Sequence, residues 1–282
     1  MRRLIIRPGA IGDSILALPA MESLRAGYTE VWVASQSVPL VRFADCVRGI
    51  ASTGLDRIGI EGLEAPRLDG FDSIVSWYGT RRPEFREAVR ELPFQFLPAL
   101  PEDGAHMHAA DFFLRQAGGG AFPAIPRIEC PRGSGDYVAI HPFSGSAKKN
   151  WPLERYRELA RRLPAPVRWT AGPEEALEDA VRFEDLYELA CWLAGARLYI
   201  GNDSGITHLA AASGTPVLAL FGPTDPAVWA PRGPQVRILT PESAGAPVDE
   251  IPLEAVLAAA SRMLESGTGV RTIHLQSNAQ VE

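Results

Sequence analysis

Residues 198–214 read Leu-Tyr-Ile-Gly-Asn-Asp-Ser-Gly-Ile-Thr-His-Leu-Ala-Ala-Ala-Ser-Gly. A short apolar run is followed by a glycine turn and then by an alanine-rich stretch, which is the pattern of a strand that turns into a helix. The first amides of such a helix, those of Ser204, Gly205 and Ile206, have no partner inside the helix and attract anions. Asp203 precedes them, and its carboxylate suits sugar or ribose hydroxyls. The stretch therefore predicts a diphosphate site at the end of a strand.

His208 lies one turn into the predicted helix. We favour an imidazole satisfied by a backbone carbonyl beneath the site. A role in proton transfer stays open, although it requires a substrate proton positioned beside the ring.

The same alternation of short apolar runs with amphipathic stretches continues along the whole chain and predicts an α/β fold with doubly wound parallel sheets. At 282 residues, two domains are expected. A stretch rich in proline and glycine at 123–135 predicts the linker. We place an N-terminal Rossmann-like domain at 1–130 and a C-terminal one at 131–282. A helix at about 252–266 is expected to pack back on the N-terminal domain, and the polar tail after 267 is expected to be mobile.

Strands and helices are predicted at definite positions on this pattern. Strands are expected at 4–7, 30–35, 73–78, 94–99, 137–142, 167–171, 198–202 and 217–221. Helices are expected at 14–25, 84–92, 153–163, 186–195, 206–213 and 253–264.

A second glycine turn follows the first predicted strand, where residues 8–14 read Pro-Gly-Ala-Ile-Gly-Asp-Ser. Gly9 and Gly12 allow a tight turn and the close approach of a ligand to the main chain. Asp13 then places a carboxylate where ligands bind in such folds, so it is a candidate general base. It is also a candidate helix N-cap, and the two roles are compatible. The third glycine of a dinucleotide fingerprint is absent, which disfavours an NAD-dependent oxidoreductase.

A loop with two lysines follows the strand predicted at 137–142. The chain has 28 lysines and arginines, yet Lys148 and Lys149 are the only lysines. A compact ammonium beside the hydroxyl of Ser144 and the small Gly145 indicates phosphate binding. The alternative is a pair of solvated loop lysines.

Taken in order, these segments resemble glycosyltransferase family 9, the ADP-heptose:lipopolysaccharide heptosyltransferases and their relatives. The family's opening pattern appears at Gly9–Asp13 with Pro19 and Leu24-Arg25, and its Lys-x-Trp-Pro step appears at 149–152. Its Asp-Ser-Gly-x-Thr-His signature with the later Gly-Pro-Thr-Asp-Pro turn runs from 203 to 226, and a weaker match is His108-x-x-Asp111. The resemblance implies a GT-B fold, in which two Rossmann-like domains face each other across a cleft.

The resemblance also implies roles for individual residues. Asp13 would deprotonate the acceptor hydroxyl, with inversion at the anomeric carbon. Nucleotide-sugar donor binding would involve Ser144, Gly145, Lys149, Glu175, Asp203, Ser204, Gly205, Ile206 and His208. In that set Lys149 neutralises phosphate, Glu175 binds ribose hydroxyls, and residues 184–186 border the base. The donor would be ADP-heptose, and the acceptor would be a lipopolysaccharide-core, other glycan or lipid-linked hydroxyl.

Two departures from the family concern the nucleotide pocket and the acceptor. Only a short stretch separates Pro173 from Leu186, where relatives carry more chain, so a non-catalytic nucleotide-sugar binding protein is the alternative function. Residues 77–79 read Trp-Tyr-Gly where the family has an acidic or amide residue. Gly12, Arg82 and Arg86 are the candidate acceptor residues. Arg82, Arg86 and Arg90 share a predicted helix face, and the alternative is a solvated face paired with Glu87 and Glu91.

Composition narrows the class of partner and the compartment. The net charge of −6 provides no basic field for nucleic acid, so no nucleic-acid partner is expected. The three cysteines show no metal-ligand spacing and suit the cytoplasm. We expect no obligatory cofactor, no metal site and no signal or membrane-spanning segment. The expected location is cytoplasmic, with peripheral contact at the inner membrane and the oligomeric state left open.

Overall fold

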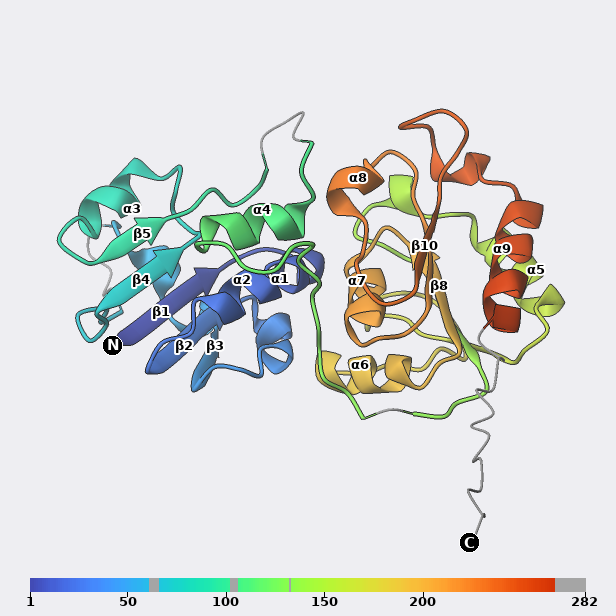
Figure 1. Ribbon diagram of the computed structural model, residues 1–282, viewed down its shortest axis with the longest axis horizontal. Coiled ribbons are helices and arrows are strands. Elements are labelled where there is room, and N and C mark those ends of the chain that lie inside the picture. The colour runs from blue at the N-terminus through green and yellow to red at the C-terminus, as the bar shows by residue number, and fades with distance from the viewer. Residues whose placement is uncertain (61–65, 102–105, 132, 267–282) are drawn as a thin grey trace, which may run out of the picture.

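Two parallel sheets of five strands each lie side by side in the computed structural model (Figure 1). The model describes residues 1–60, 66–101, 106–131 and 133–266, so the tail expected after 267 lies outside the described residues. The first half of the chain builds one sheet and the second half builds the other. The predicted α/β class is confirmed.

The N-terminal sheet has the strand order β3-β2-β1-β4-β5, with all neighbours parallel. Its strands are β1 (Arg2–Arg7), β2 (Tyr28–Val33), β3 (Cys46–Gly49), β4 (Ser73–Ser76) and β5 (Phe94–Phe96). Its helices are α1 (Ile11–Leu16), α2 (Leu18–Ser23), α3 (Pro83–Ala88) and α4 (Ala109–Gln116). The order reverses between β1 and β4, which makes the loop after β1 the expected ligand position. The helix predicted over 14–25 is two helices, because α2 begins anew with Pro19 in its first turn.

The C-terminal sheet has the strand order β10-β9-β8-β6-β7, again with all neighbours parallel. Its strands are β6 (Val138–His141), β7 (Val167–Trp169), β8 (Leu198–Asn202), β9 (Val217–Leu220) and β10 (Val236–Leu239). Its helices are α5 (Leu153–Arg162), α6 (Leu186–Ala194), α7 (Gly205–Ala212), α8 (Pro226–Trp229) and α9 (Leu253–Ser266). The order reverses between β6 and β8, so the loops after these two strands form the second expected ligand position.

One apolar core joins the two halves of the molecule. Side chains of α1, α2 and α4 from the N-terminal half and of α6 and α7 from the C-terminal half belong to the same buried cluster. Glycines allow α1 and α7 to cross closely: a Cβ on Gly205 would lie 2.8 Å from Cβ of Ile11, and one on Gly12 would lie 3.2 Å from Cδ2 of His208. The contact brings the start of α1 directly beside the start of α7.

Helix α9 packs on the C-terminal sheet, so the expectation that it returns to the N-terminal domain is wrong. Its buried face shares a core with β6, β8 and α5 through Val256, Ala259, Ala260 and Leu264. Arg162 of α5 also forms a bidentate ion pair with Glu254 of α9. The helix closes the outer layer of its own sheet, where small alanines permit close packing.

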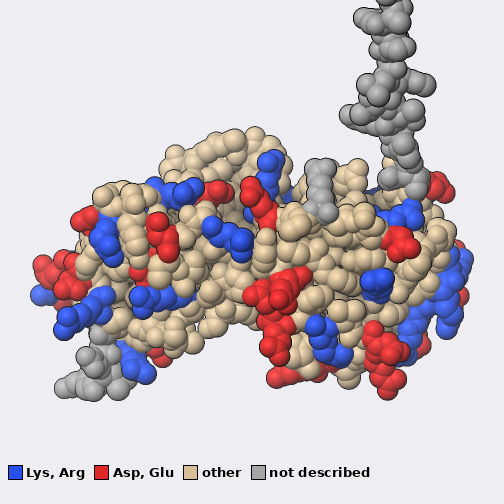
Figure 2. All heavy atoms as spheres, turned by 90° about the horizontal axis from the view of Figure 1, so that it is seen from below, with Lys and Arg blue, Asp and Glu red and all other residues tan. Residues whose placement is uncertain are grey.

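The chain crosses from one sheet to the other between α4 and β6, and we propose residue 130 as the boundary between the domains. Acidic and basic side chains are interspersed over the face shown in Figure 2. Within the described residues, no helix combines the length and the apolar character needed to span a lipid bilayer.

Candidate active site

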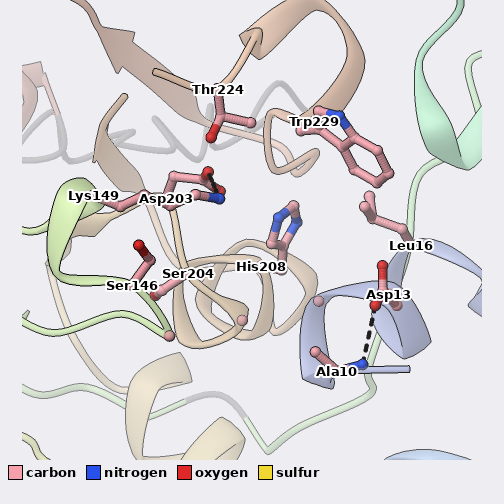
Figure 3. Close-up of a pocket in the computed structure, with 13 residues that line it drawn as sticks. Ala10, Asp13, Leu16, Ser146, Lys149, Asp203, Ser204, His208, Thr224 and Trp229 are labelled. Carbon is pink, nitrogen blue, oxygen red and sulfur yellow. Dashed lines mark hydrogen bonds and ion pairs between the residues drawn. The ribbon is translucent and has the colours of Figure 1, made fainter. Parts of the chain in front are cut away.

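A cavity of about 420 Å³ lies where the loops of the two sheets meet. Its lining comes from both halves: Ala10, Gly12, Asp13 and Leu16 from the loop after β1 and α1, Gly145, Ser146 and Lys149 from the loop after β6, Asp203, Ser204, Gly205 and His208 from the end of β8 and α7, and Thr224 and Trp229 from the β9–α8 turn and α8 (Figure 3). These loops leave the carboxyl ends of the strands at which both sheets reverse their order. Sheet topology therefore explains why the cavity forms here.

Asp13 presents a half-buried carboxylate from the first turn of α1. Its Oδ2 accepts a hydrogen bond from the amide of Ala10 at 3.0 Å. Ala10 is the N-cap residue, so Asp13 satisfies an amide of the cap from inside the helix and is not itself the N-cap. Gly9 has a φ of 127°, and a Cβ there would lie 2.8 Å from that same carboxylate oxygen. Gly9 is thus required for the turn that exposes Asp13.

Beneath Asp13 lies Arg7, a buried guanidinium that the sequence analysis did not single out. Its Nη2 donates to the backbone oxygen of Asp13 at 3.4 Å, and its Nη1 donates to that of Ala99 at 3.3 Å. The guanidinium also lies 4.4 Å from the ring centroid of Phe113. Burial lowers the pKa of Arg7 to about 10, which the attraction of Asp13 only partly offsets. Arg7 remains a cation at neutral pH and supports α1 from below.

On the opposite wall, Lys149 forms an ion pair with Asp203, whose Oδ2 lies 2.6 Å from Nζ of the lysine. Asp203 is buried, whereas the Lys149 side chain is 33% exposed and lines the cavity. The pair joins two segments that the sequence predicted separately as parts of one site. The ammonium is therefore held at the cavity wall by the Asp203 carboxylate, and its other N–H groups can donate to an anionic ligand.

The buried Asn202 stabilises the wall of the cavity that carries Lys149 and Asp203. Its Oδ1 accepts hydrogen bonds from the amide of Trp151 and the hydroxyl of Tyr156, and its Nδ2 donates to the carbonyl of Pro142. Trp151 is buried and donates its indole N–H to the carbonyl of Ile251 at 2.9 Å. The end of β8 is thereby tied to the loop that carries Lys149, including its 3-10 turn η4 (Ala147–Lys149).

The start of α7 faces the cavity with Ser204 and Gly205 but not with Ile206. Ser204 is the N-cap, and its hydroxyl accepts from the amide of Thr207 at 3.3 Å. That hydroxyl serves the helix, which leaves the early amides of Gly205 and Ile206 as donors without an intrahelical acceptor. The Ile206 side chain packs against the core between the sheets and does not line the cavity.

His208 lines the cavity between Asp13 and Asp203 (Figure 3). Among the described residues, no backbone carbonyl forms a hydrogen bond with its ring, so the favoured interpretation of the sequence is not borne out. Burial lowers the pKa of His208 to about 4, and the carboxylates of Asp203 and Asp13 oppose this shift only in part. The imidazole is therefore neutral at neutral pH.

This shift predicts a pH dependence of stability. The pKa of His208 in the folded protein lies below its ordinary value of 6.5. The contribution of the neutral imidazole to the free energy of unfolding is therefore fully present above about pH 6.5 and is lost as the pH falls towards 4. The loss is on the order of 3 kcal/mol. We expect His208→Gln to lose less stability than the wild type between about pH 7 and pH 4.5, measured by urea unfolding. His106→Gln, at an exposed histidine, is the control; equal losses in wild type and His208→Gln would contradict the assignment.

Besides Ile206, two predicted donor residues, Ser144 and Glu175, lie outside the lining. Ser144 donates its hydroxyl within its own loop, to the carbonyl of Ser146 or to Oδ1 of Asn150. Glu175 accepts hydrogen bonds through Oε2 from the amide of Gly172 at 2.6 Å and from Nε2 of His141 at 3.0 Å. Burial acts to raise the pKa of Glu175, but these hydrogen bonds outweigh it and the pKa lies below its ordinary value. Within the described part of the chain, no hydrogen bond is formed by Oε1 of Glu175.

The arginines of the predicted acceptor face divide into two groups. Arg90 pairs with Glu87 and Glu91, as the solvated-face alternative predicts. Arg82 and Arg86 instead line a second cavity, of about 570 Å³, beside the ends of β4 and β5. Arg86 lies 4.7 Å from the ring centroid of Phe96, which positions its guanidinium at that cavity.

Five residues that line the main cavity were absent from the predicted site: Ala10, Leu16, Ser146, Thr224 and Trp229. The sequence does not indicate Leu16 and Trp229 as site residues, because an isolated apolar side chain is ordinarily predicted to lie in the core. Thr224 stands in the Gly-Pro-Thr-Asp-Pro turn, where the motif was noted without a role for the hydroxyl. Of the described residues, no group of three or more His, Cys, Asp or Glu side chains is arranged to hold a metal ion.

Comparison with known proteins shows which family the sequence resembles. Residues 114–250 match the family model described as glycosyltransferase family 9 (heptosyltransferase). Lipopolysaccharide heptosyltransferase 1 of Salmonella typhimurium strain LT2 is 34% identical over 134 residues, which are 41% of this chain and 42% of the relative. The match thus spans less than half the length of that curated relative.

Solved structures agree over nearly the whole chain. ADP-heptose LPS heptosyltransferase II of E. coli has a TM-score of 0.71 at 17% identity, covering 94% of this chain and 99% of that one. E. coli heptosyltransferase WaaC with ADP has a TM-score of 0.67 at 18% identity, covering 93% and 100%. At these identities the likeness establishes the fold, which is the predicted GT-B arrangement. The chain therefore resembles glycosyltransferase family 9 over residues 114–250 and has the fold of these heptosyltransferase structures.

Proposed function

We propose that this chain is an inverting glycosyltransferase, which moves a sugar from a nucleoside diphosphate sugar to an acceptor hydroxyl. One observation carries the proposal: a carboxylate from one sheet and a lysine with free helix amides from the other line a single cavity. By family resemblance the sugar is heptose, the donor is ADP-heptose, and the acceptor is a lipopolysaccharide-core or other glycan.

The donor occupies the C-terminal wall. Its diphosphate binds Lys149 and the amides at the start of α7, where the positive end of the helix adds to the attraction. Asp203 faces the donor sugar, Gly145 allows the main chain to approach the phosphates, and Oε1 of Glu175 accepts from a ribose hydroxyl. Ser144 supports the loop from within.

In the transfer step, the acceptor hydroxyl oxygen attacks the anomeric carbon on the face opposite the leaving diphosphate. The proton of that hydroxyl goes to Asp13, and the electrons of the broken C–O bond go to the phosphate oxygen. Lys149 and the α7 amides offset the charge that develops on the leaving group. The proposal assigns this charge to protein groups and routes no step through a metal ion.

The acceptor approaches from the N-terminal half. Gly12 borders the path to Asp13, and Arg82 and Arg86 line the neighbouring cavity. Guanidinium groups at such a cavity suit a glycan or lipid-linked acceptor with carboxylate or phosphate groups. The reaction is then located in the cytoplasm, with contact at the cytoplasmic face of the inner membrane during acceptor binding.

The alternative is a nucleotide-sugar binding protein without transferase activity, and the short segment after Pro173 favours it. Arg182 closes that segment by donating to the carbonyls of Glu175 and Leu177, both at 2.9 Å. With this segment held by Arg182, less room remains around the nucleotide base than a longer loop would leave.

A panel of nucleoside diphosphate sugars tests both functions. We expect ADP-heptose to raise the melting temperature and to be consumed when a lipopolysaccharide-core acceptor is added, with the same rate in excess EDTA. Binding without consumption of any donor would favour the binding protein. Binding of no nucleotide sugar in the panel would contradict both.

A further inference from the structure

Trp229 reaches the cavity from the C-terminal half and lies on the side where Asp13 stands. It is the last residue of α8, which follows the turn that carries Thr224. Figure 3 shows its indole beside Leu16, above the Asp13 carboxylate and across the cavity from the Lys149–Asp203 pair. The side chain is partly exposed and lines the cavity. An aromatic side chain thus borders the cavity on the side of Asp13, opposite Lys149.

The segment after Trp229 is held by the N-terminal half of the molecule. The carbonyl of Ala230 lies 2.8 Å from Nε2 of His108, the N-cap of α4. Arg232 forms a bidentate ion pair with Asp111 of α4, with N–O distances of 2.7 Å and 2.8 Å. Such forked pairs fix orientation as well as distance.

His108 and Asp111, the two residues of the His108-x-x-Asp111 pattern, do not line the cavity. Their role in the structure is to hold Ala230 and Arg232, which follow Trp229. Oδ1 of Asp111 also accepts from the amide of Ala124, and Arg232 donates to the carbonyl of Ala124 at 3.0 Å. Burial lowers the pKa of His108, so its ring stays neutral near neutral pH while it donates to Ala230. The backbone next to Trp229 is therefore held in relation to both halves of the molecule.

We propose that Trp229 contacts the donor sugar and determines which sugar is accepted, an inference that rests on the proposed transferase function. The face of an indole is apolar and polarisable, and it suits the C–H face of a sugar ring. Lys149 and the α7 amides hold the diphosphate on one side, and on the other side Asp13 must reach the acceptor hydroxyl that attacks the anomeric carbon. The sugar ring must therefore lie between them, in the cavity that the indole borders.

Stacking of Trp229 on the donor sugar can be distinguished from simple packing of its side chain against Leu16. A packing role requires only the volume of the indole against Leu16, which a leucine would partly replace. A stacking role requires an aromatic face, which phenylalanine keeps and leucine lacks. Trp229→Phe and Trp229→Leu are therefore a matched pair of variants.

The test compares the affinities for ADP and ADP-heptose by isothermal titration calorimetry. We expect the gain in affinity from the heptose to fall about five- to tenfold in Trp229→Leu and to be largely kept in Trp229→Phe, with ADP affinity unchanged in both. Melting temperatures verify that both variants are folded.

The outcomes separate this inference from the function on which it rests. If the wild type binds neither nucleotide, the proposed function fails and the inference fails with it. If the wild type binds both and Trp229→Leu keeps the full gain from the heptose, the inference alone is overturned. A loss of ADP affinity equal to the loss of ADP-heptose affinity also overturns it, because the effect would then lie on the nucleotide.

Discussion

Asp13→Asn lowers the rate of sugar transfer by about 10²- to 10⁴-fold, the range typical of a lost general base. The asparagine has nearly the same shape, and its amide oxygen can still accept from the amide of Ala10. The turn after β1 should therefore keep its form while the group that takes the proton is gone. The measurement is the initial rate of product formation at saturating donor and acceptor.

Donor affinity is the second readout for this variant. Because the donor binds the opposite wall of the cavity, we expect the dissociation constant for ADP-heptose to change less than about threefold, within the effect expected for a distant site. Glu22→Gln removes an exposed carboxylate from α2 and serves as the control. A wild-type rate in Asp13→Asn would remove the proposed base, and an equal rate loss in Glu22→Gln would show a nonspecific charge effect.

Lys149→Met has the second largest expected effect and acts on donor binding. It removes the ammonium that meets the diphosphate, and it leaves the buried Asp203 carboxylate without its cationic partner. Loss of a charge-assisted contact costs about 2–3 kcal/mol, so affinity for ADP should fall on the order of 30- to 150-fold. Titration calorimetry with ADP measures this directly.

The neighbouring lysine supplies the control. Lys148 is exposed and does not line the main cavity, so Lys148→Met should bind ADP as the wild type does. The double variant Lys149→Met with Asp203→Asn should recover part of the affinity, since the uncompensated carboxylate is then neutral. Equal losses in the two lysine variants would contradict a specific phosphate contact at Lys149.

Much of the fold was predictable because the buried strands carry continuous apolar runs. Strands β1, β6, β8 and β9 were predicted at their positions. The edge strands β3 and β10 were missed, since their residues are only partly buried and lack such a run. The packing of α9 was also wrong, because an amphipathic pattern shows that a helix has an apolar face but not which sheet will cover it.

The site was predictable where glycine turns follow strands. Gly9 and Gly205 stand out because the backbone there has no room for a Cβ, so a local pattern carries the geometric requirement. Contacts between distant segments were not predictable. The Lys149–Asp203 pair and the long-range contacts of the buried Arg7 join segments far apart in the sequence within one half of the molecule. The place of Trp229 depends on how the two halves meet. No spacing in the sequence encodes these arrangements.

The most direct test of the account is a crystal structure of the protein with ADP-heptose bound. We predict the diphosphate within hydrogen-bond distance of Lys149 Nζ and the first amides of α7, with the anomeric carbon in the cavity on the side of Asp13. A nucleotide sugar bound away from this cavity, or one whose anomeric carbon is turned from Asp13, would contradict the central claim.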